Sequence, residues 1–325
     1  MMILLPLLKK FFDSRNETSR FVIAYSGGLD SHVLLHAASH GCNKVIAVHV
    51  NHQLNKHSNA WATHCQQTCA DLNVDCHIET VALNLKPGDS VEEKARLMRY
   101  AALEKYIDKN SVLLTAHTLN DQAETFLLQA LRGAGPKGLS AMPIQKKFGQ
   151  GILYRPLLTC SRDEISAYAT KHKLQWIEDE SNQDTRFNRN FLRHTIFPAL
   201  KARWPAVHEN LARSAQLMGE YEKVISEIGE QDYQAIFQKQ CECVCECDHG
   251  ASLYLDPLLQ LSDLRQRLVL REWLRIHQQR MPSKKQLAQI QKDVLGAQRD
   301  ANPVFCLENS VIRRSREYLY LTNSE

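Results

Sequence analysis

Near its N-terminus the chain reads Phe21-Val22-Ile23-Ala24-Tyr25-Ser26-Gly27-Gly28-Leu29-Asp30-Ser31. The apolar run predicts a buried β-strand, and the apolar residues at 33–35 predict a helix that begins just after the turn. Paired glycines between a strand and a helix expose backbone N–H groups at the positive end of the helix, where phosphate binds. The segment therefore predicts a nucleotide site at the end of a strand.

The turn is not a Walker A loop, because it lacks the G-x-x-x-x-G-K-[ST] spacing and its lysine. This points away from transfer of the γ-phosphate. Residues 26–31 resemble the SGGxDS PP-loop of the ATP pyrophosphatase superfamily, whose members cut ATP between its α- and β-phosphates. The resemblance implies that the glycines, Ser26 and Ser31 hold pyrophosphate and that Asp30 helps to position Mg²⁺. An ordinary Ser-Gly-Gly turn beside a helix start is the alternative.

The N-terminal half of the chain alternates between two kinds of segment. Apolar β-type runs occupy residues 21–25, 44–50, 74–81 and 111–116, and amphipathic helix-length segments occupy 31–39, 57–72, 91–107 and 121–131. This alternation predicts an α/β fold with a Rossmann-like parallel sheet and flanking helices. Ligands bind outside the carboxyl ends of such strands. The glycine turn, Asn51-His52 and His117 each follow a strand, so we expect them at one edge, with His52 at the nucleotide site.

The chain of 325 residues divides into three predicted parts. Residues 1–200 form the α/β domain, residues 201–250 a helical arm and linker, and residues 251–325 a small basic α+β domain. In the last part, helices are expected over 256–277 and 284–295 and short strands over 304–321. Lys and Arg number 40 against 36 Asp and Glu, and this net charge of +4 permits a nucleic-acid partner without requiring one.

Ten cysteines in a chain with no export signal predict reduced thiols in the cytosol. Four of them alternate with other residues over 241–247, which is not the C-x-x-C spacing of zinc sites. A metal site and a linker or edge strand both stay open for this cluster. No apolar run approaches the length of a membrane span, so we expect a soluble protein in the cytoplasm.

Four further sequence segments make the resemblance specific to one family within this superfamily. They read Val48-His49-Val50-Asn51-His52-Gln53-Leu54, Ala95-Arg96-Leu97-Met98-Arg99-Tyr100, Thr115-Ala116-His117-Thr118-Leu119-Asn120-Asp121-Gln122-Ala123-Glu124-Thr125, and Glu180-Ser181-Asn182 with Arg189-Asn190-Phe191-Leu192-Arg193. In this order and at these distances they are similar to the tRNA(Ile)-lysidine synthase family, over nearly the whole chain. The resemblance implies a cytoplasmic ATP-dependent ligase that acts on the wobble cytidine, at position 34, of the isoleucine tRNA with a CAU anticodon.

The implied reaction has two steps. The C2 oxygen of cytosine is a poor leaving group, so the base is first adenylated with release of pyrophosphate, and free L-lysine then displaces AMP through a new C–N bond. The lysine side chain, with a pKa of about 10.4, is almost wholly ammonium near neutral pH. The site must therefore bind a cation and deprotonate it. The implied cofactors are ATP and Mg²⁺, and the implied partners are tRNA and L-lysine without a membrane; the oligomeric state stays open, with a homodimer among the alternatives.

Two carboxylates are the candidates for binding the lysine. Asp121 and Glu124 are three residues apart and share a helix face, so one or both can pair with the ammonium and one can take its proton. The same spacing is also that of a capping box at a helix start. His117, at the end of the fourth strand, is the candidate donor to a phosphate or to the activated base.

Arginines are the candidates for binding phosphates and tRNA. Arg96 and Arg99 share a helix face and suit the α-phosphate, with salt bridges to nearby glutamates as the alternative reading. The resemblance implies that an arginine of the Arg189 to Arg193 block contacts the adenylated intermediate or the tRNA, and leaves open which of the two does so. Arg132 lies in a Gly-rich loop suited to phosphates. A further group in the terminal domain is expected to hold the tRNA stem: Arg265, Arg267, Arg271, Arg275, Arg313 and Arg314.

Two other functions compete with this interpretation. Another PP-loop enzyme, such as a tRNA thiolase or an amide-forming synthetase, predicts C-x-x-C pairs or a glutaminase partner, and the chain has no C-x-x-C pair. A nucleotide-responsive RNA-binding protein predicts ATP binding without turnover. Longer members of the family carry a further C-terminal domain for the acceptor side of the tRNA, so how methionine tRNA, with the same CAU anticodon, is rejected stays open.

Overall fold

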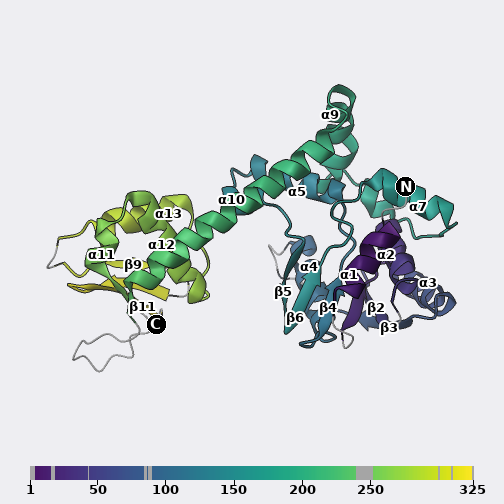
Figure 1. Ribbon diagram of the computed structural model, residues 1–325, viewed down its shortest axis with the longest axis horizontal. Coiled ribbons are helices and arrows are strands. Elements are labelled where there is room, and N and C mark those ends of the chain that lie inside the picture. The colour runs from purple at the N-terminus through teal and green to yellow at the C-terminus, as the bar shows by residue number, and fades with distance from the viewer. Residues whose placement is uncertain are drawn as a thin grey trace. The chain divides into compact units, whose positions relative to one another are not determined.

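The computed structural model describes residues 4–15, 19–42, 44–83, 86, 90–238, 252–298, 301–308 and 310–323. The chain forms two compact units, Met1–Gly219 and Glu220–Glu325, and helix α10 (Val207–Ile236) contains the boundary between them (Figure 1). The cysteines at 241–247 lie outside the described residues, so both interpretations of that cluster stay open. Within the described residues, every helix is too short or too polar to span a lipid bilayer.

The first unit is built on a six-stranded sheet with the strand order β3-β2-β1-β4-β6-β5. Five strands are parallel: β1 (Arg20–Ala24), β2 (Val45–Asn51), β3 (Asp75–Thr80), β4 (Ser111–Leu114) and β6 (Gly151–Tyr154). The edge strand β5 (Gln145–Phe148) runs antiparallel to β6. The predicted α/β fold with a parallel sheet is confirmed, and the antiparallel edge is an addition to it.

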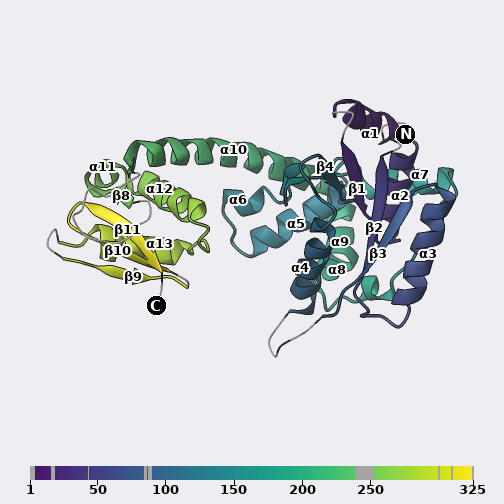
Figure 2. The ribbon, with the colours of Figure 1, turned by 90° about the horizontal axis from the view of Figure 1, so that it is seen from below.

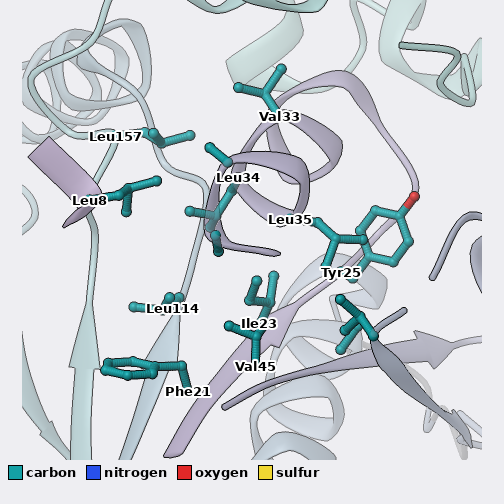
Figure 3. Close-up of a cluster of buried hydrophobic side chains, with 14 of the residues drawn as sticks. Leu8, Phe21, Ile23, Tyr25, Val33, Leu34, Leu35, Val45, Leu114 and Leu157 are labelled. Carbon is teal, nitrogen blue, oxygen red and sulfur yellow. The ribbon is translucent and has the colours of Figure 1, made fainter. Parts of the chain in front are cut away.

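Helices cover both faces of this sheet (Figure 2). One face packs against α1 (Leu4–Asp13), α2 (Leu29–Ser39), α3 (Ser58–Asp71) and α7 (Arg162–Lys171), and the other against α4 (Val91–Glu104). Because side chains alternate along a strand, β1 contributes side chains to the hydrophobic clusters on both faces of the sheet. Phe21 and Ile23 enter the larger cluster, shown in Figure 3, while Val22 packs with Leu103 of α4 on the opposite face.

The strand order places the candidate segments at one point of the sheet. After β1 the chain turns into α2, and after β4 it turns into α5 (Leu119–Leu131). These two strands are neighbours, while β2 and β3 continue the sheet on one side and β6 and β5 on the other. In open α/β sheets this reversal of strand order opens a crevice at the carboxyl ends of the strands, where ligands bind.

A group of histidines lies where α2 packs against α7. Nδ1 of His36 is 2.9 Å from the hydroxyl oxygen of Tyr168. The His36 ring centroid is 4.4 Å from that of His40 and 4.8 Å from that of His172. Burial, followed by the charges of His40, His172 and His32, lowers the pKa of His36 to about 4.

We expect this group to make the fold sensitive to acid. In the unfolded chain His36 titrates near pH 6.5, so between about pH 6.5 and 4 the unfolded state binds more protons and stability falls with falling pH. The variant His36→Asn cannot titrate, and its melting temperature should change less across this window. His57→Asn, at an exposed histidine, is the matched control and should follow the parent protein; equal slopes for all three proteins would contradict the expectation.

The second unit has an antiparallel sheet with the order β7-β8-β11-β10-β9. Its strands are β7 (Phe237–Gln238), β8 (Ser252–Tyr254), β9 (Val304–Cys306), β10 (Ser310–Arg314) and β11 (Tyr318–Asn323), and its helices are α11 (Leu255–Gln260), α12 (Asp263–Ile276) and α13 (Lys284–Ile290). The single helix expected over 256–277 is wrong. Leu261 and Ser262 are extended, and Ser262 stands at the N-cap of α12.

The prediction that Arg314 holds the tRNA stem is wrong. The Arg314 side chain is 4% exposed, and Nη1 donates to the carbonyl oxygens of Val294, Leu295 and Ala297 at 2.9 Å each. Arg314 therefore caps a helix end and cannot hold a tRNA phosphate from this position. Of the other arginines in the group, Arg265 is paired with Asp232 and Arg275 with Glu272.

Candidate active site

The glycine turn is fixed by a small network of hydroxyl groups. Ser26 and Ser31 lie with their Oγ atoms 2.9 Å apart, and the Ser31 hydroxyl also donates to the Gly28 carbonyl at 3.0 Å. Gly28 stands at the N-cap of α2, and no side chain in the described part of the chain caps this end of the helix. The first N–H groups of α2 therefore stay available to an anion. As predicted, the turn joins a buried strand to a helix.

Gly27 is required by both conformation and space. Its φ of +82° is in the left-handed region, and a Cβ atom there would lie 2.5 Å from Cδ1 of Ile177 and 2.9 Å from Sγ of Cys65. The Ile177 N–H donates to the Gly27 carbonyl at 2.9 Å. A segment distant in sequence thus packs directly against the turn.

We expect Gly27→Ala to weaken ATP binding by at least about tenfold, because a strained backbone costs about 1–3 kcal/mol and the turn must shift to clear Ile177. Titration calorimetry with ATP measures the effect. Gly133→Ala is the matched control, since Gly133 has a φ of +69° but nothing within 4 Å of the added Cβ. Unchanged ATP affinity in Gly27→Ala would remove the turn from the nucleotide site.

Asp30 lies in the first turn of α2 with an unsatisfied oxygen. Its Oδ1 atom is buried and has no hydrogen-bond partner in the described residues. Burial raises the pKa of this carboxyl, while the charge of Arg162 acts in the opposite direction. The described residues contain no cluster of three or more metal-binding side chains. Magnesium in nucleotide sites usually needs one or two carboxylates besides the phosphates, so an unpartnered carboxylate beside the turn fits that ion.

Asp121 and Glu124 lie on α5 and form ion pairs with two arginines. Arg193 donates from Nε to Oε1 of Glu124 at 2.8 Å and from Nη2 to Oε2 at 2.9 Å, and its Nη2 also reaches Oδ1 of Asp121 at 3.2 Å. Nε of Arg189 is 3.3 Å from Oε2 of Glu124, and its Nη2 donates to Thr125 Oγ1 at 2.7 Å. Both arginines of the predicted block therefore contact the predicted carboxylates.

The two carboxylates differ in accessibility. The side chain of Glu124 is 2% exposed and that of Asp121 is 15% exposed. Burial raises the pKa of Glu124 above its ordinary value although Arg193 opposes the shift. Burial acts on Asp121 in the same direction, but the Thr118 N–H, His117 and the arginines hold the pKa of Asp121 below its ordinary value.

Asp121 also caps the helix. Its Oδ2 accepts from the Thr118 N–H at 2.9 Å, while the Thr118 hydroxyl accepts from the Asp121 N–H, which completes a capping box. The capping box raised by the sequence, Asp121 with Glu124, is therefore wrong, because Thr118 is the N-cap and Asp121 stands at N3. The observed capping box does not displace the other interpretation, because Oδ1 of the same side chain faces Arg193.

His117 lies three residues after the end of β4 and is within reach of the charges of Asp121 and Arg189. Its Nδ1 is 3.0 Å from Oγ1 of Thr115. Burial lowers the pKa of His117 to about 4; Asp121 opposes this shift, and Arg155, Arg189 and Arg96 add to it. The imidazole is therefore neutral at physiological pH and can accept a hydrogen bond or a proton.

The remaining predicted residues lie on three different segments. His52 is half-buried after β2, and burial followed by the charge of Arg99 lowers its pKa. Arg96 and Arg99 lie on α4, and the charge of Arg96 reaches His117. Arg132 stands exposed at the C-cap of α5, and no hydrogen bond or ion pair joins it to the carboxylates within the described residues. Its predicted contact with substrate stays a prediction.

Sequence reasoning missed Arg155. This residue follows β6 directly, is 2% exposed, and donates from Nη1 to the Pro143 carbonyl at 2.6 Å. Its signal was present, because an arginine stands at the carboxyl end of another apolar run, the edge where ligands bind. That run was not recognised as a strand, so the arginine was not placed.

The chain is similar to known proteins over most of its length. A family model described as a PP-loop domain matches residues 5–200, and one described as the TilS substrate binding domain matches residues 253–320. The tRNA(Ile)-lysidine synthase of Coxiella burnetii is 49% identical over 321 residues, which cover 98% of this chain and 69% of that protein. The tRNA(Ile)-lysidine synthase of Vibrio atlanticus is 44% identical, covering 93% and 68% respectively.

Among solved structures, the U34-tRNA thiolase NcsA of Methanococcus maripaludis, described with its [4Fe-4S] cluster, matches with a TM-score of 0.55. The match covers 66% of this chain and 78% of that one at 16% sequence identity. This likeness shows the shared fold and carries no information on the reaction.

Proposed function

Because the chain belongs to the tRNA(Ile)-lysidine synthase family, we propose that it uses ATP and free L-lysine to convert the wobble cytidine of a CAU-anticodon isoleucine tRNA to lysidine. One observation supports this most directly. The phosphate-binding turn and the cluster of Asp121, Glu124, Arg189 and Arg193 share one edge of the sheet, and Arg193 is near enough to Asp30 for their charges to interact. Activation and amine attack can therefore occur in one place.

In the first step the cytosine O2 attacks the α-phosphorus of ATP and pyrophosphate leaves. The N–H groups at the start of α2, with Ser26 and Ser31, bind the leaving pyrophosphate. Asp30 and the phosphates would hold Mg²⁺, which would supply neutralisation of charge on the phosphate oxygens. Arg96, Arg99 and Arg189 are the cations available to the phosphate that stays on the base.

In the second step the side-chain amine of lysine attacks C2, and the C2–O2 bond breaks so that AMP leaves with that oxygen. Asp121 is the better of the two carboxylates to receive the ammonium, because its Oδ1 has one contact of 3.2 Å and its side chain is the more exposed. Glu124 is committed to Arg193 through two shorter bonds. Glu124 thus positions the arginine, while Asp121 or neutral His117 takes the proton that the ammonium loses.

The RNA substrate suits this site for a separate reason. Bases of an anticodon loop are single-stranded, so a cytosine can leave the stack and enter a pocket at modest cost. The second unit, which matches the substrate binding domain, is proposed to hold the tRNA body. Exposed arginines there, Arg271 and Arg313, stay candidates for phosphate contacts.

The decisive experiment is incubation of the purified chain with ATP, labelled lysine and a CAU-anticodon isoleucine tRNA. We expect label in the tRNA with equimolar release of AMP and pyrophosphate. The same tRNA with cytidine 34 replaced by uridine is the matched control and should take up no label. Formation of ADP and orthophosphate, or AMP release with no labelled tRNA, would overturn the proposal.

A further inference from the structure

Tyr100 occupies an unusual position on α4. The guanidinium carbon of Arg96, one turn earlier, lies 5.1 Å from the centroid of its ring. Nζ of Lys146, on edge strand β5, lies 5.7 Å from the same centroid. The ring of Phe148 meets Tyr100 edge-on, with centroids 5.6 Å apart and an interplanar angle of 64°. Two cations thus share one aromatic ring, which a second ring supports.

A third cation, Arg155, interacts with the same tyrosine. Burial lowers the pKa of the Arg155 guanidinium, and the phenol of Tyr100 acts against that shift. In the described part of the chain, no ion pair to a carboxylate involves Arg96, Lys146 or Arg155. Unpaired positive charges that converge in this way favour an anion between them.

The contact between Arg96 and Tyr100 matters because the charge of Arg96 acts on a residue of the candidate site. The charge of Arg96 contributes to the low pKa of His117, so the guanidinium is held within electrostatic reach of the imidazole. Arg96 is solvent-exposed, and a long exposed side chain without a carboxylate partner would otherwise sample many rotamers. A planar guanidinium on an aromatic face loses that freedom in advance.

We propose that Tyr100 is a positioning residue that holds the Arg96 guanidinium over its ring, where the guanidinium meets the phosphate of the adenylated cytidine. Phe148 and Arg155 fix the Tyr100 ring. The inference rests on the proposed function, since Arg96 is there a phosphate-binding residue. The proposed role is preorganisation. Tyr100 does not touch the substrate but keeps Arg96, which binds the phosphate, in the reactive arrangement.

A double-mutant cycle tests the proposal. In Tyr100→Leu we expect single-turnover adenylation to slow by about two- to fivefold, the range that an exposed cation–π contact can supply. The KM for ATP should stay within about twofold, because the glycine turn binds pyrophosphate separately. In the Arg96→Ala background, the same Tyr100→Leu change should slow the reaction no further.

The outcomes of the cycle distinguish failure of the proposed role of Arg96 from failure of the proposed role of Tyr100. If Arg96→Ala alone leaves the rate unchanged, the proposed role of Arg96 fails. If Arg96→Ala slows the reaction while Tyr100→Leu does not, or if the two losses multiply, the positioning role of Tyr100 fails. Tyr100→Phe keeps the ring and should retain most of the activity, which is the matched control.

A second measurement does not depend on how well Tyr100→Leu folds. Phenylalanine analogues with increasing fluorination at position 100 keep the ring shape and progressively weaken its attraction for a cation. We expect the single-turnover rate to fall stepwise along this series while the melting temperature stays level. A flat series would show that the ring is only a packing element, and would overturn the proposal.

Discussion

Arg193→Met is expected to destabilise the first unit by about 3–5 kcal/mol, because it leaves two carboxylates, Glu124 and Asp121, without their main cation in a site from which water is largely excluded. Arg189 keeps one contact with Glu124 at 3.3 Å, but this cannot replace the two-bond pairing with Arg193. Urea unfolding followed by circular dichroism measures the change.

Two further variants show whether the loss comes from the buried charge. Glu124→Met in the Arg193→Met background removes the abandoned carboxylate and should recover part of the stability. Arg186→Met removes an arginine that is 89% exposed and paired with Asp184, and it should leave the unfolding midpoint almost unchanged. If Arg193→Met alone is as stable as the parent protein, water reaches the carboxylate cluster and the expectation is wrong.

Asp121→Asn is expected to reduce lysidine formation by about a thousandfold while ATP affinity stays within about threefold. The amide oxygen can still accept the Thr118 N–H, so the helix cap survives. What is lost is the charge beside Arg193 that receives the lysine ammonium. Labelled-lysine incorporation and equilibrium ATP binding measure the two effects separately.

The matched control for this variant lies on another capping box. Glu164→Gln in α7 alters the same kind of helix start, where Ser161 caps the helix and the Glu164 side chain is exposed. It should leave lysidine formation unchanged. If both variants lose activity equally, the effect belongs to helix capping, and if Asp121→Asn loses ATP binding as well, the carboxylate is part of the nucleotide site.

The sequence was most informative where local rules determine the structure. The apolar run at 21–25 and the paired glycines specify a strand, a left-handed residue and a helix start within eleven residues, so the turn was predictable. The carboxyl-end rule then brought the segments after β1, β2 and β4 to one edge without knowledge of any contact.

Other features depended on tertiary contacts that no local pattern reveals. β5 is a short exposed strand, Gln145–Phe148, that is defined only by its pairing with β6. The helix expected over 256–277 is interrupted because Ser262 caps a new start. Likewise, the sequence placed Arg189 and Arg193 near the substrate, but their pairing with Glu124 depends on side chains 65 or more positions apart in sequence. The individual roles of the site residues stay predictions.

The bond from the Ile177 N–H to the Gly27 carbonyl has a consequence for synthesis on the ribosome. The turn leaves the exit tunnel early, but the residue that supports it is 150 positions later in the chain. β4 and β6, which complete the sheet beside β1, are also translated long after it. A nascent chain that ends before Ile177 therefore carries the entire phosphate-binding motif without the packing that holds it in shape. ATP should bind only when the chain has emerged beyond Ile177.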